Sequence, residues 1–340
     1  MIGWYVHAHG RGHLQRLQCI AAHLRTPVTG LSSLPRPAGW DGAWVQLADD
    51  QPTGAGRDPT ARGDPTAGGT LHWAPTHHPG LRDRMAAIAG WVAGARPALV
   101  VVDVSVEVSV LVRALGVPVV VAAMRGERTD RAHRTAYDLA DALLAPWPGS
   151  LPEPWPQAWL DKAWHVGALS RVDGRPVSPP PGDRRVAVLW GSGGSEVSLA
   201  DVEAARAATP GWTWDISGLP GAPWLADPWP VLAGADVVVT NAGQNALAEV
   251  AAARRPAVVL PQERPHAEQA ANARALARGG LALVRDRWPA AELWPALLDR
   301  AAAQDGAAWS RWSDGHGAER AAGLLDAAAA RHREVSCVPQ

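Results

Sequence analysis

The sequence predicts an α/β protein built from two doubly wound, Rossmann-like domains that face a central cleft. Three observations lead to this fold class. Short apolar, β-branched runs alternate with alanine-rich helical stretches along the chain, which is typical of a parallel sheet covered by helices. Glycine-rich turns follow two of the predicted strands, as at the ligand-binding edges of such sheets. A proline-rich segment interrupts the alternation near the middle, and the pattern then starts again.

The first half of the chain carries the elements of one such domain. Apolar runs with β-branched residues predict the strands, and a glycine turn or a closing glycine marks the helix ends. The predicted elements are a strand over residues 2–7, a helix over 13–24, a strand over 99–102, a helix over 106–115 closed by Gly116, and a strand over 117–122.

Residues 51–80 depart from this pattern. Proline, glycine, threonine and aspartate dominate, and Asp-Pro-Thr-Ala occurs at residues 58–61 and again at 64–67. Two copies of four residues do not make a repeat architecture. We expect a long exposed loop here, of the kind that is either functional or disordered.

A second break, from Arg171 to Arg185, contains four prolines and is typical of a semi-rigid connector between domains. The pattern after it predicts strands over 186–190, 237–240 and 257–260, and helices over 201–208, 245–254, 268–278 and 318–332. We therefore divide the chain into an N-terminal domain (1–167), a proline-rich linker (168–184), a C-terminal domain (185–316), and a C-terminal helix and tail (317–340).

The composition excludes several classes of protein. The 340 residues include 32 basic and 33 acidic side chains, and a net charge of −1 argues against a dedicated nucleic-acid binder. Cys19 and Cys337 lie at opposite ends, which leaves no disulfide scaffold and no cysteine-based zinc site. No run of 18 apolar residues is present and the opening apolar run is too short for a signal peptide, so we expect a cytoplasmic protein. Lys162 is the only lysine and lies far in sequence from both glycine-rich turns, which argues against a lysine-based phosphate clamp.

The first glycine-rich turn carries three histidines, His7, His9 and His13, around residues 10–12. Glycines after a strand let a ligand approach the backbone and direct helix N–H groups at an anion. The turn lacks the full dinucleotide fingerprint. A zinc site and a tight turn with satisfied histidines are the alternatives, although no nearby carboxylate or cysteine completes a zinc shell. His13, at the helix start, is the candidate general base, because the helix dipole favours the neutral imidazole.

The second glycine-rich turn is Gly191-Ser192-Gly193-Gly194-Ser195, directly after an apolar strand. No Gly-Lys-Ser/Thr follows, so the turn is not a Walker loop. Its backbone N–H groups and the Ser192 hydroxyl can still hold a diphosphate.

The most informative segment is 236–276, where a strand ends in a polar glycine turn and the next helix carries Glu249. The following strand ends at Pro261, and another helix opens with Glu268 and Gln269. Carboxylate and amide groups at the carboxyl edge of adjacent strands suit the neighbouring hydroxyls of a ribose or a sugar. The alternative for Glu268 and Gln269 is that they only offset the dipole of their helix.

This segment resembles the C-terminal donor-binding domain of GT-B glycosyltransferases, in the MurG-like branch of glycosyltransferase family 28. The turn at residues 10–13 resembles the N-terminal Gly-Gly-His loop of that family, so the likeness extends over nearly the whole chain. The residues that match the C-terminal pattern are Gly243, Glu249, Pro261, Glu268, Gln269, Asn272 and Ala273.

The resemblance implies the GT-B fold and roles for individual residues. Glu249 would hold the ribose hydroxyls of a nucleotide diphosphate sugar, while Glu268 and Gln269 would bind hydroxyls of the donor sugar. Where the family carries a threonine hydroxyl this chain has Ala246, and Asn245 is the candidate replacement. The remaining residues assigned to donor binding are Gly12, Ser192, Gly193, Gly194, Asn241, Gly243, Gln244 and Asn272.

The chemistry that this implies needs no metal and no cofactor. The sequence contains no Asp-x-Asp pair, so we expect helix N-termini, glycine-loop amides and an arginine to neutralise the leaving diphosphate. An inverting displacement also needs a base near the acceptor hydroxyl. His13 is the first candidate and Asp103, at the end of an apolar strand, is the second; Asp103 is alternatively the N-cap of the next helix.

Four arginines recur at every third residue from 125 to 134, around Asp130, a predicted helix N-cap. Arginine in a first turn opposes the helix dipole, which makes Arg125 and Arg128 candidate contacts for the donor diphosphate or a phosphorylated acceptor. The alternative is a solvated face that nearby acidic residues partly neutralise.

The sequence therefore predicts an inverting, metal-independent glycosyltransferase that moves a hexose or N-acetylhexosamine from a UDP-sugar to an acceptor hydroxyl. The expected partners are a nucleotide-sugar donor and a small-molecule or lipid-linked acceptor, with no nucleic acid; peripheral contact with the inner face of a membrane stays open. The alternatives are a nucleotide-sugar hydrolase or 2-epimerase on the same fold, and a non-catalytic GT-B-like subunit that binds a nucleotide sugar.

Overall fold

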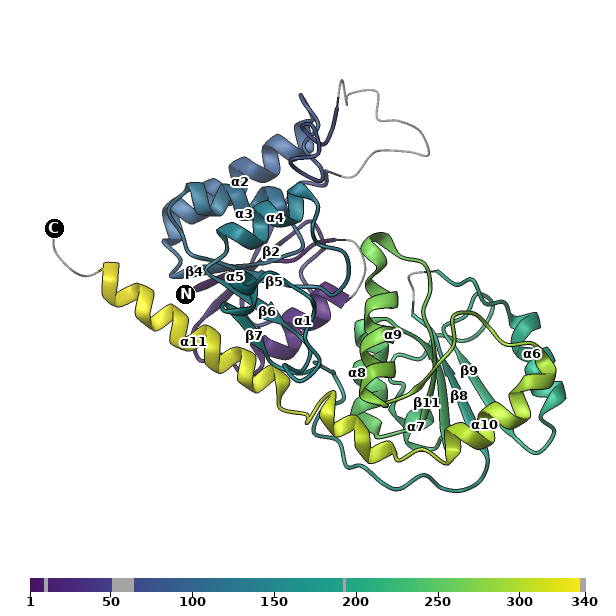
Figure 1. Cartoon of the computed structure of the whole chain (residues 1–340). Coiled ribbons are helices and arrows are strands. Elements are labelled where there is room, and N and C mark those ends of the chain that lie inside the picture. The colour runs from purple at the N-terminus through teal and green to yellow at the C-terminus, as the bar shows by residue number, and fades with distance from the viewer. Residues whose placement is uncertain (9–11, 51–63, 192–193, 337–340) are drawn as a thin grey trace.

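The computed structural model contains two α/β domains, each built on one parallel sheet (Figure 1). The structure describes residues 1–8, 12–50, 64–191 and 194–336, with the side chains of 333–336 left aside. The seven-stranded sheet has the order β3-β2-β1-β4-β5-β6-β7, and the five-stranded sheet has the order β12-β11-β10-β8-β9. The predicted fold class, two doubly wound domains, is confirmed.

The first sheet lies between helices on both faces. Its strands are β1 (Ile2–Tyr5), β2 (Val28–Ser32), β3 (Ala43–Gln46), β4 (Leu99–Asp103), β5 (Val119–Ala122), β6 (Ala142–Ala145) and β7 (Ala163–His165). The helices between them are α1 (Gly12–Ala21), α2 (Pro79–Ala95), α3 (Val106–Ala114), α4 (Arg131–Leu139) and α5 (Gln157–Leu160).

The second sheet begins at Arg185, after the proline-rich stretch. Its strands are β8 (Arg185–Leu189), β9 (Thr213–Ser217), β10 (Val237–Asn241), β11 (Ala257–Leu260) and β12 (Leu283–Val284). Its helices are α6 (Leu199–Ala208), α7 (Trp229–Ala233), α8 (Gln244–Ala253), α9 (Glu268–Gly279) and α10 (Trp294–Ala302), with the 3-10 turns η1 (Pro265–Ala267), η2 (Ala291–Leu293) and η3 (Gly306–Arg311).

Each sheet has a point where the strand order reverses direction, between β1 and β4 in the first and between β8 and β10 in the second. The central strands β4 and β10 are buried over their whole length and apolar up to their polar carboxyl ends, as expected of parallel strands with helices on both faces. Ligands bind outside the carboxyl ends of the strands at such switch points, because the loops that leave there diverge to opposite faces. We therefore expect the ligand-binding residues at the carboxyl ends of β1, β4, β8 and β10.

The last helix, α11 (Gly317–Ser336), returns to the first domain and lies along it (Figure 1). Its small apolar face, with Ala321 and Leu325 fully buried, packs in one core with Leu17 and Ile20 of α1. Asp326 accepts hydrogen bonds from the backbone N–H groups of Arg25 and Thr26, which fixes the helix to the loop after α1. No helix in the described part of the chain is both long enough and apolar enough to cross a bilayer.

The structure differs from the predicted elements at short strands and at four helices that the sequence analysis does not predict, namely α2, α5, α7 and α10. β1 ends at Tyr5 rather than His7, and α1 ends at Ala21 rather than Leu24. The sequence does not predict β2, because Gly30 interrupts its apolar run; a Cβ at Gly30 would lie 2.3 Å from the ring of Trp44 on β3. The glycine thus serves the packing of two neighbouring strands. The other strands that the sequence does not predict are β3, β6, β7, β9 and β12.

The predicted long loop, residues 51–80, is only partly a loop. Residues 51–63 lie outside the described residues, and α2 already begins at Pro79. Between them, the backbone N–H groups of His72 and Trp73 donate to Glu107 Oε1 at 2.7 and 2.9 Å. The expectation of a wholly exposed loop is wrong for this stretch, since a half-buried carboxylate on α3 anchors it.

Candidate active site

The two candidate bases form a pair at the switch point of the first sheet. β1 lies beside β4, so the turn after β1 and the end of β4 share one edge. His13, in the first turn of α1, places Nδ1 2.9 Å from Asp103 Oδ1. The His13 side chain is 14% exposed, whereas Asp103 is completely buried. Ser105, not Asp103, caps α3 by accepting from the N–H of Val108, so the N-cap interpretation of Asp103 is wrong.

Arg16, one turn after His13, also contacts Asp103. Its Nη1 donates to Asp103 Oδ1 at 2.6 Å. Burial alone would raise the pKa of Asp103, but Arg16 and His13 outweigh it and hold that pKa below its ordinary value. An ionised Asp103 accepts the Nδ1–H of His13, which leaves Nε2 with a lone pair able to take a proton. The arrangement is that of an oriented general base.

Arg16 also connects the two domains, because its Nη2 donates to Gln244 Oε1 at 2.8 Å. A second contact runs from Asn245 Nδ2 to Gln15 Oε1 at 3.2 Å. Gln244 and Asn245, both assigned to donor binding, thus meet α1 across the cleft. Gly12, a third assigned residue, lies in the same contact, since a Cβ there would come within 3.3 Å of Asn245 Nδ2.

A cavity of about 370 Å³ opens between the domains at this contact. Residues from both domains and from the connecting segment line it. The lining residues are Gly12, Gln15, Arg171, Leu189, Trp190, Gly191, Ser217, Trp224, Leu225, Ala226, Asn245, Ala246 and Glu249. We call it the donor cavity.

Glu249, on α8, is the acidic group of the donor cavity. Its side chain is 7% exposed, and Arg171 Nε donates to its Oε1 at 2.8 Å. Burial raises the pKa of this carboxyl, and Arg171 offsets only part of the rise. Arg171 is itself held by a bond from Nη1 to the carbonyl of Ala226 at 2.7 Å. The sequence does not single out Arg171 or Trp224, which is half-exposed at the cavity, because neither lies in a recognisable motif.

The polar residues at the ends of β10 and β11 mostly hold the backbone. Asn241 Oδ1 accepts from the N–H of Gly243, and Gln269 Oε1 accepts from the N–H groups of Ala242 and Gln262. Asn272 is 1% exposed and donates to the carbonyl of Ala242 at 2.9 Å. Asn272 thus supports the turn at Ala242, and its contact with the donor stays a prediction. Asn241 and Gln269 are also buried and shape the turn.

The second glycine-rich turn is partly described. Ser192 and Gly193 lie outside the described residues, so their predicted diphosphate contacts stay predictions. Gly194 has φ +90°, a conformation that glycine adopts without strain, and its carbonyl accepts from Arg264 Nη2 at 3.0 Å. Arg264, which the sequence does not single out, thus brings a positive charge beside this turn.

Glu268 begins α9 and faces the first domain. Gly126 approaches it so closely that a Cβ at residue 126 would lie 3.1 Å from its backbone. Burial raises the pKa of Glu268, while the charges of Arg128, Arg16, His13 and Arg264 act in the opposite direction. Because Arg264 lies at the second glycine-rich turn and Arg16 beside His13, Glu268 lies between that turn and the His13–Asp103 pair.

Replacing Glu268 with glutamine is expected to raise the Tm of the ligand-free protein. A raised pKa means that the folded chain holds this proton at pH values where the unfolded chain releases it, so Glu268 costs stability as the pH rises above 4.5. Thermal unfolding measured as a function of pH should give Glu268→Gln a higher Tm than the parent protein above pH 4.5 and the same Tm below it. Glu203→Gln, at an exposed position, is the control; equal Tm profiles for Glu268→Gln and the parent protein would contradict the expectation.

The structure gives Arg125 and Arg128, the two candidate contacts for a diphosphate, partners within the protein. Arg125 is fully buried, pairs with Glu153, and donates to the carbonyl of Leu151, so its guanidinium stabilises the 151–153 turn and its anionic partner is Glu153. Arg128 is 4% exposed and donates to His133 Nε2 at 3.1 Å. Asp130 caps α4 by accepting from the N–H of His133, as the sequence predicts.

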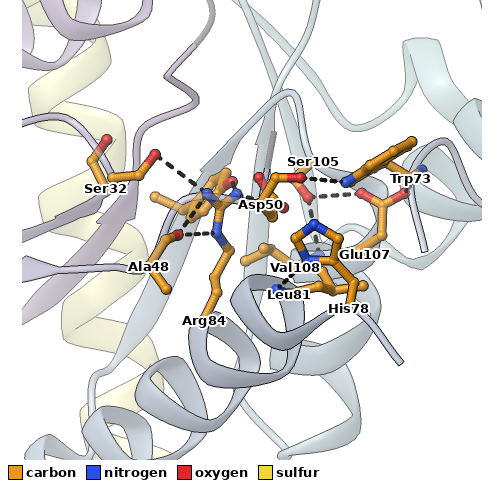
Figure 2. Close-up of polar contacts among 12 residues, drawn as sticks. Ser32, Ala48, Asp50, Trp73, His78, Leu81, Arg84, Ser105, Glu107 and Val108 are labelled. Carbon is orange, nitrogen blue, oxygen red and sulfur yellow. Dashed lines mark hydrogen bonds and ion pairs between the residues drawn. The ribbon is translucent and has the colours of Figure 1, made fainter. Parts of the chain in front are cut away.

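A second cavity, of about 320 Å³, lies on the first domain beside the His13 pair; we call it the acceptor-side cavity. Its wall includes His7, whose ring meets that of His13 edge-on with centroids 5.9 Å apart. Figure 2 shows the polar groups around it: Arg84 on α2 pairs with Asp50 and donates to the carbonyl of Ala48, and Glu107 accepts from Trp73. The ring of Trp73 and the carboxylates of Asp50 and Glu107 thus line the acceptor-side cavity.

Comparison with known proteins agrees with this architecture. Residues 225–295 match the glycosyltransferase family 28 C-terminal domain. No curated protein matches the chain. Among solved structures, MurG of Acinetobacter baumannii is 18% identical with a TM-score of 0.61, covering 96% of this chain and 99% of its own. The glycotransferase of kitacinnamycin is 18% identical with a TM-score of 0.65, covering 96% and 98%.

A plant enzyme has the same fold. UGT2 of Phytolacca americana, solved with UDP-2-fluoroglucose and pterostilbene, is 16% identical with a TM-score of 0.66, covering 97% of this chain and 98% of its own. At these identities the likeness establishes the fold: the chain has the GT-B fold of glycosyltransferases, and its second domain carries a family 28 segment.

Proposed function

We propose that this protein is an inverting glycosyltransferase that moves a hexose or N-acetylhexosamine from a UDP-sugar to an acceptor hydroxyl without a metal in the transfer step. The observation that carries the proposal is the position of the His13–Asp103 pair. Gly12, next to His13, lines the donor cavity, and His7, against the His13 ring, lines the acceptor-side cavity. A base between a cavity at the domain interface and a cavity on the first domain suits transfer from a ligand in one to a ligand in the other. The family 28 segment and the GT-B fold support this activity.

The donor nucleotide would occupy the donor cavity. Glu249 Oε2, the oxygen not bonded to Arg171, would accept a ribose hydroxyl, and the ring of Trp224 would stack on the base. The diphosphate would then lie near Gly191 and Gly194, with the positive charge of Arg264 and the uncapped N-terminus of α8 at Gly243 beside it. No lysine is needed for this neutralisation.

The sugar would lie toward Glu268, near His13. His13 Nε2 takes the proton of the acceptor hydroxyl as that oxygen attacks the anomeric carbon. The bond from this carbon to the phosphate oxygen breaks on the opposite face, and the nucleoside diphosphate leaves with the electron pair. One displacement inverts the anomeric configuration. Asp103 stays ionised and stabilises the imidazolium that forms.

The acceptor would enter the acceptor-side cavity, whose volume suits a small molecule or the terminal sugar of a lipid-linked one. A cytoplasmic location, with or without peripheral contact with a membrane, belongs to the same proposal. The lining carries Asp50 and Glu107 against Arg84, so a neutral or cationic acceptor is preferred to an anionic one.

Trp224→Ala is expected to raise the KM for the UDP-sugar about fivefold, because a stacking contact contributes about 1 kcal/mol or more. The kcat should change little, since the base of the nucleotide takes no part in bond breaking. Steady-state kinetics with one donor varied measures both. Trp44→Ala, on strand β3 of the first domain, is the control. An unchanged donor KM in Trp224→Ala would contradict the stacking contact.

The proposal as a whole is tested by incubating the protein with a panel of nucleotide sugars and hydroxyl acceptors. Thermal shifts first identify the donor, because specific binding raises the Tm by mass action. NMR of the product then gives the anomeric configuration, which is expected to be inverted, and added Mg²⁺ is expected to leave the rate unchanged. Release of free sugar without an acceptor would identify a hydrolase, C2 inversion of the sugar an epimerase, and donor binding without turnover a binding subunit.

A further inference from the structure

Three histidines from distant parts of the chain meet at the interface of the two domains. His72 precedes α2, His133 lies in the first turn of α4, and His266 lies in η1 of the second domain. One nitrogen of each lies within 4.8 Å of the others. The ring centroids are 4.4 Å apart for His72 and His133, and 4.5 Å apart for His133 and His266. We call these three residues the histidine cluster.

The backbone of each histidine is held in place. The N–H of His72 donates to Glu107 Oε1 at 2.7 Å, and that of His133 donates to Asp130 Oδ1 at 3.0 Å. The carbonyl of His266 accepts from the N–H of Glu127 at 2.7 Å. His266 has φ +59°, a left-handed conformation that is unfavourable for a non-glycine residue and persists only where its surroundings impose it. The cluster is therefore preorganised across the two domains.

The hydrogen bonds of His133 leave its Nε2 as an acceptor. Asp130 Oδ2 is bonded to Nδ1, and Arg128 Nη1 donates to Nε2 at 3.1 Å. A carboxylate on the outer nitrogen of an imidazole fixes the tautomer and makes the other nitrogen a better metal ligand. The nitrogen already faces a cation, the guanidinium of Arg128.

We propose that His72, His133 and His266 bind a divalent late transition metal, with Zn²⁺ as the best match, and that this ion joins the two domains. Imidazole nitrogens suit Zn²⁺, and three histidines with one open position form a known type of zinc shell. Bonds of about 2.1 Å in tetrahedral geometry need nitrogens roughly 3.4 Å apart, so small movements of the side chains close the cluster.

The ion would replace the hydrogen bond from Arg128 to His133. Asp130, whose Oδ1 also lies 3.4 Å from His72 Nε2, would supply the nearby negative charge. Because two ligands belong to the first domain and His266 to the second, occupancy would favour the closed arrangement of the cleft. The inference does not depend on the proposed transfer reaction.

The test is zinc binding by the full chain without a polyhistidine tag. Equilibrium dialysis should give one Zn²⁺ per chain, and Co²⁺ should give the absorption bands of a tetrahedral site. His266→Asn removes a ligand from the second domain and keeps a residue that tolerates a positive φ, so its fold should persist. It is expected to weaken zinc binding at least tenfold, as is His72→Gln. His316→Asn, at an exposed position, is the control and should bind as the parent does.

Arg128→Gln separates a metal site from an anion site. Removing this cation should tighten zinc binding at the cluster, whereas a phosphate held by Arg128 and the histidines would bind less tightly. Zinc and inorganic phosphate are titrated in parallel, with thermal unfolding as a check of folding. Zinc affinity that His266→Asn and His72→Gln leave unchanged overturns the proposal. So does a phosphate-induced rise in Tm that Arg128→Gln abolishes while zinc has no effect.

Discussion

His13→Ala should lower kcat roughly 10²- to 10⁴-fold, the range that an oriented general base contributes. The donor KM should change little, because His13 lies beside the donor cavity and does not line it. Single-turnover kinetics at saturating donor and acceptor isolates the chemical step. His316→Ala, whose side chain is 68% exposed, controls for the loss of an imidazole. A His13→Ala variant with parental kcat would exclude His13 as the base.

Asp103→Asn is the companion change, since Asp103 acts through His13. It should also lower kcat, because the imidazolium that forms in the transfer step loses its buried anion. A purely structural role would lower the Tm but leave the kcat of the folded protein unchanged. The Arg16 guanidinium, left with less negative charge, makes some loss of stability part of the expected result.

Glu249→Ala should raise the donor KM about 10- to 100-fold, because a hydrogen bond to a charged group contributes about 1.5–3 kcal/mol. The kcat should fall less, since the ribose contact exists before and during the reaction. Glu203→Ala, which removes an exposed carboxylate of α6, is the matched control. Unchanged donor kinetics in Glu249→Ala would end its assignment to the ribose.

The Arg171–Glu249 ion pair also contributes to the effect of Glu249→Ala, and a double-mutant cycle separates this contribution from direct binding of the ribose. Removing Glu249 leaves Arg171 without its carboxylate, so part of the effect reflects the stranded guanidinium. Arg171→Met and the double variant complete a cycle. If Glu249 binds the ribose directly, Glu249→Ala raises the donor KM in the Arg171→Met background as well; if it only orients Arg171, the effect disappears there.

The sequence allows the α/β class and the two halves of the fold to be predicted, because long central strands and alanine-rich helices leave periodic patterns. It also identifies both His13 and Asp103, although as competing candidates. Their pairing depends on β1 lying next to β4, a topological fact that no local pattern contains. The sequence analysis does not single out Arg16, although its position three residues after His13 on the same predicted helix is a signal that could have found it.

Other parts of the site depend on contacts between distant segments. The regular spacing of arginines from 125 to 134 suggests a charged face, but the partner of Arg125 is Glu153, 28 residues later. Asn272 matches a family pattern, yet its amide serves the turn at Ala242. Glu249 is placed in a cavity as the resemblance implies, whereas Trp224 and Arg171 come from segments without a motif. Burial and partner choice, which decide these roles, arise only when the chain is folded.

The return of α11 to the first domain has a consequence for the biosynthesis of this protein. Ala321 and Leu325 complete a core with Leu17 and Ile20, so the domain that begins the chain also needs its last helix. During synthesis the second domain emerges complete while the first still lacks α11, which reverses the usual order in which domains mature on the ribosome. The chain therefore crosses between the domains at two places, which restricts their relative movement more than a single linker would.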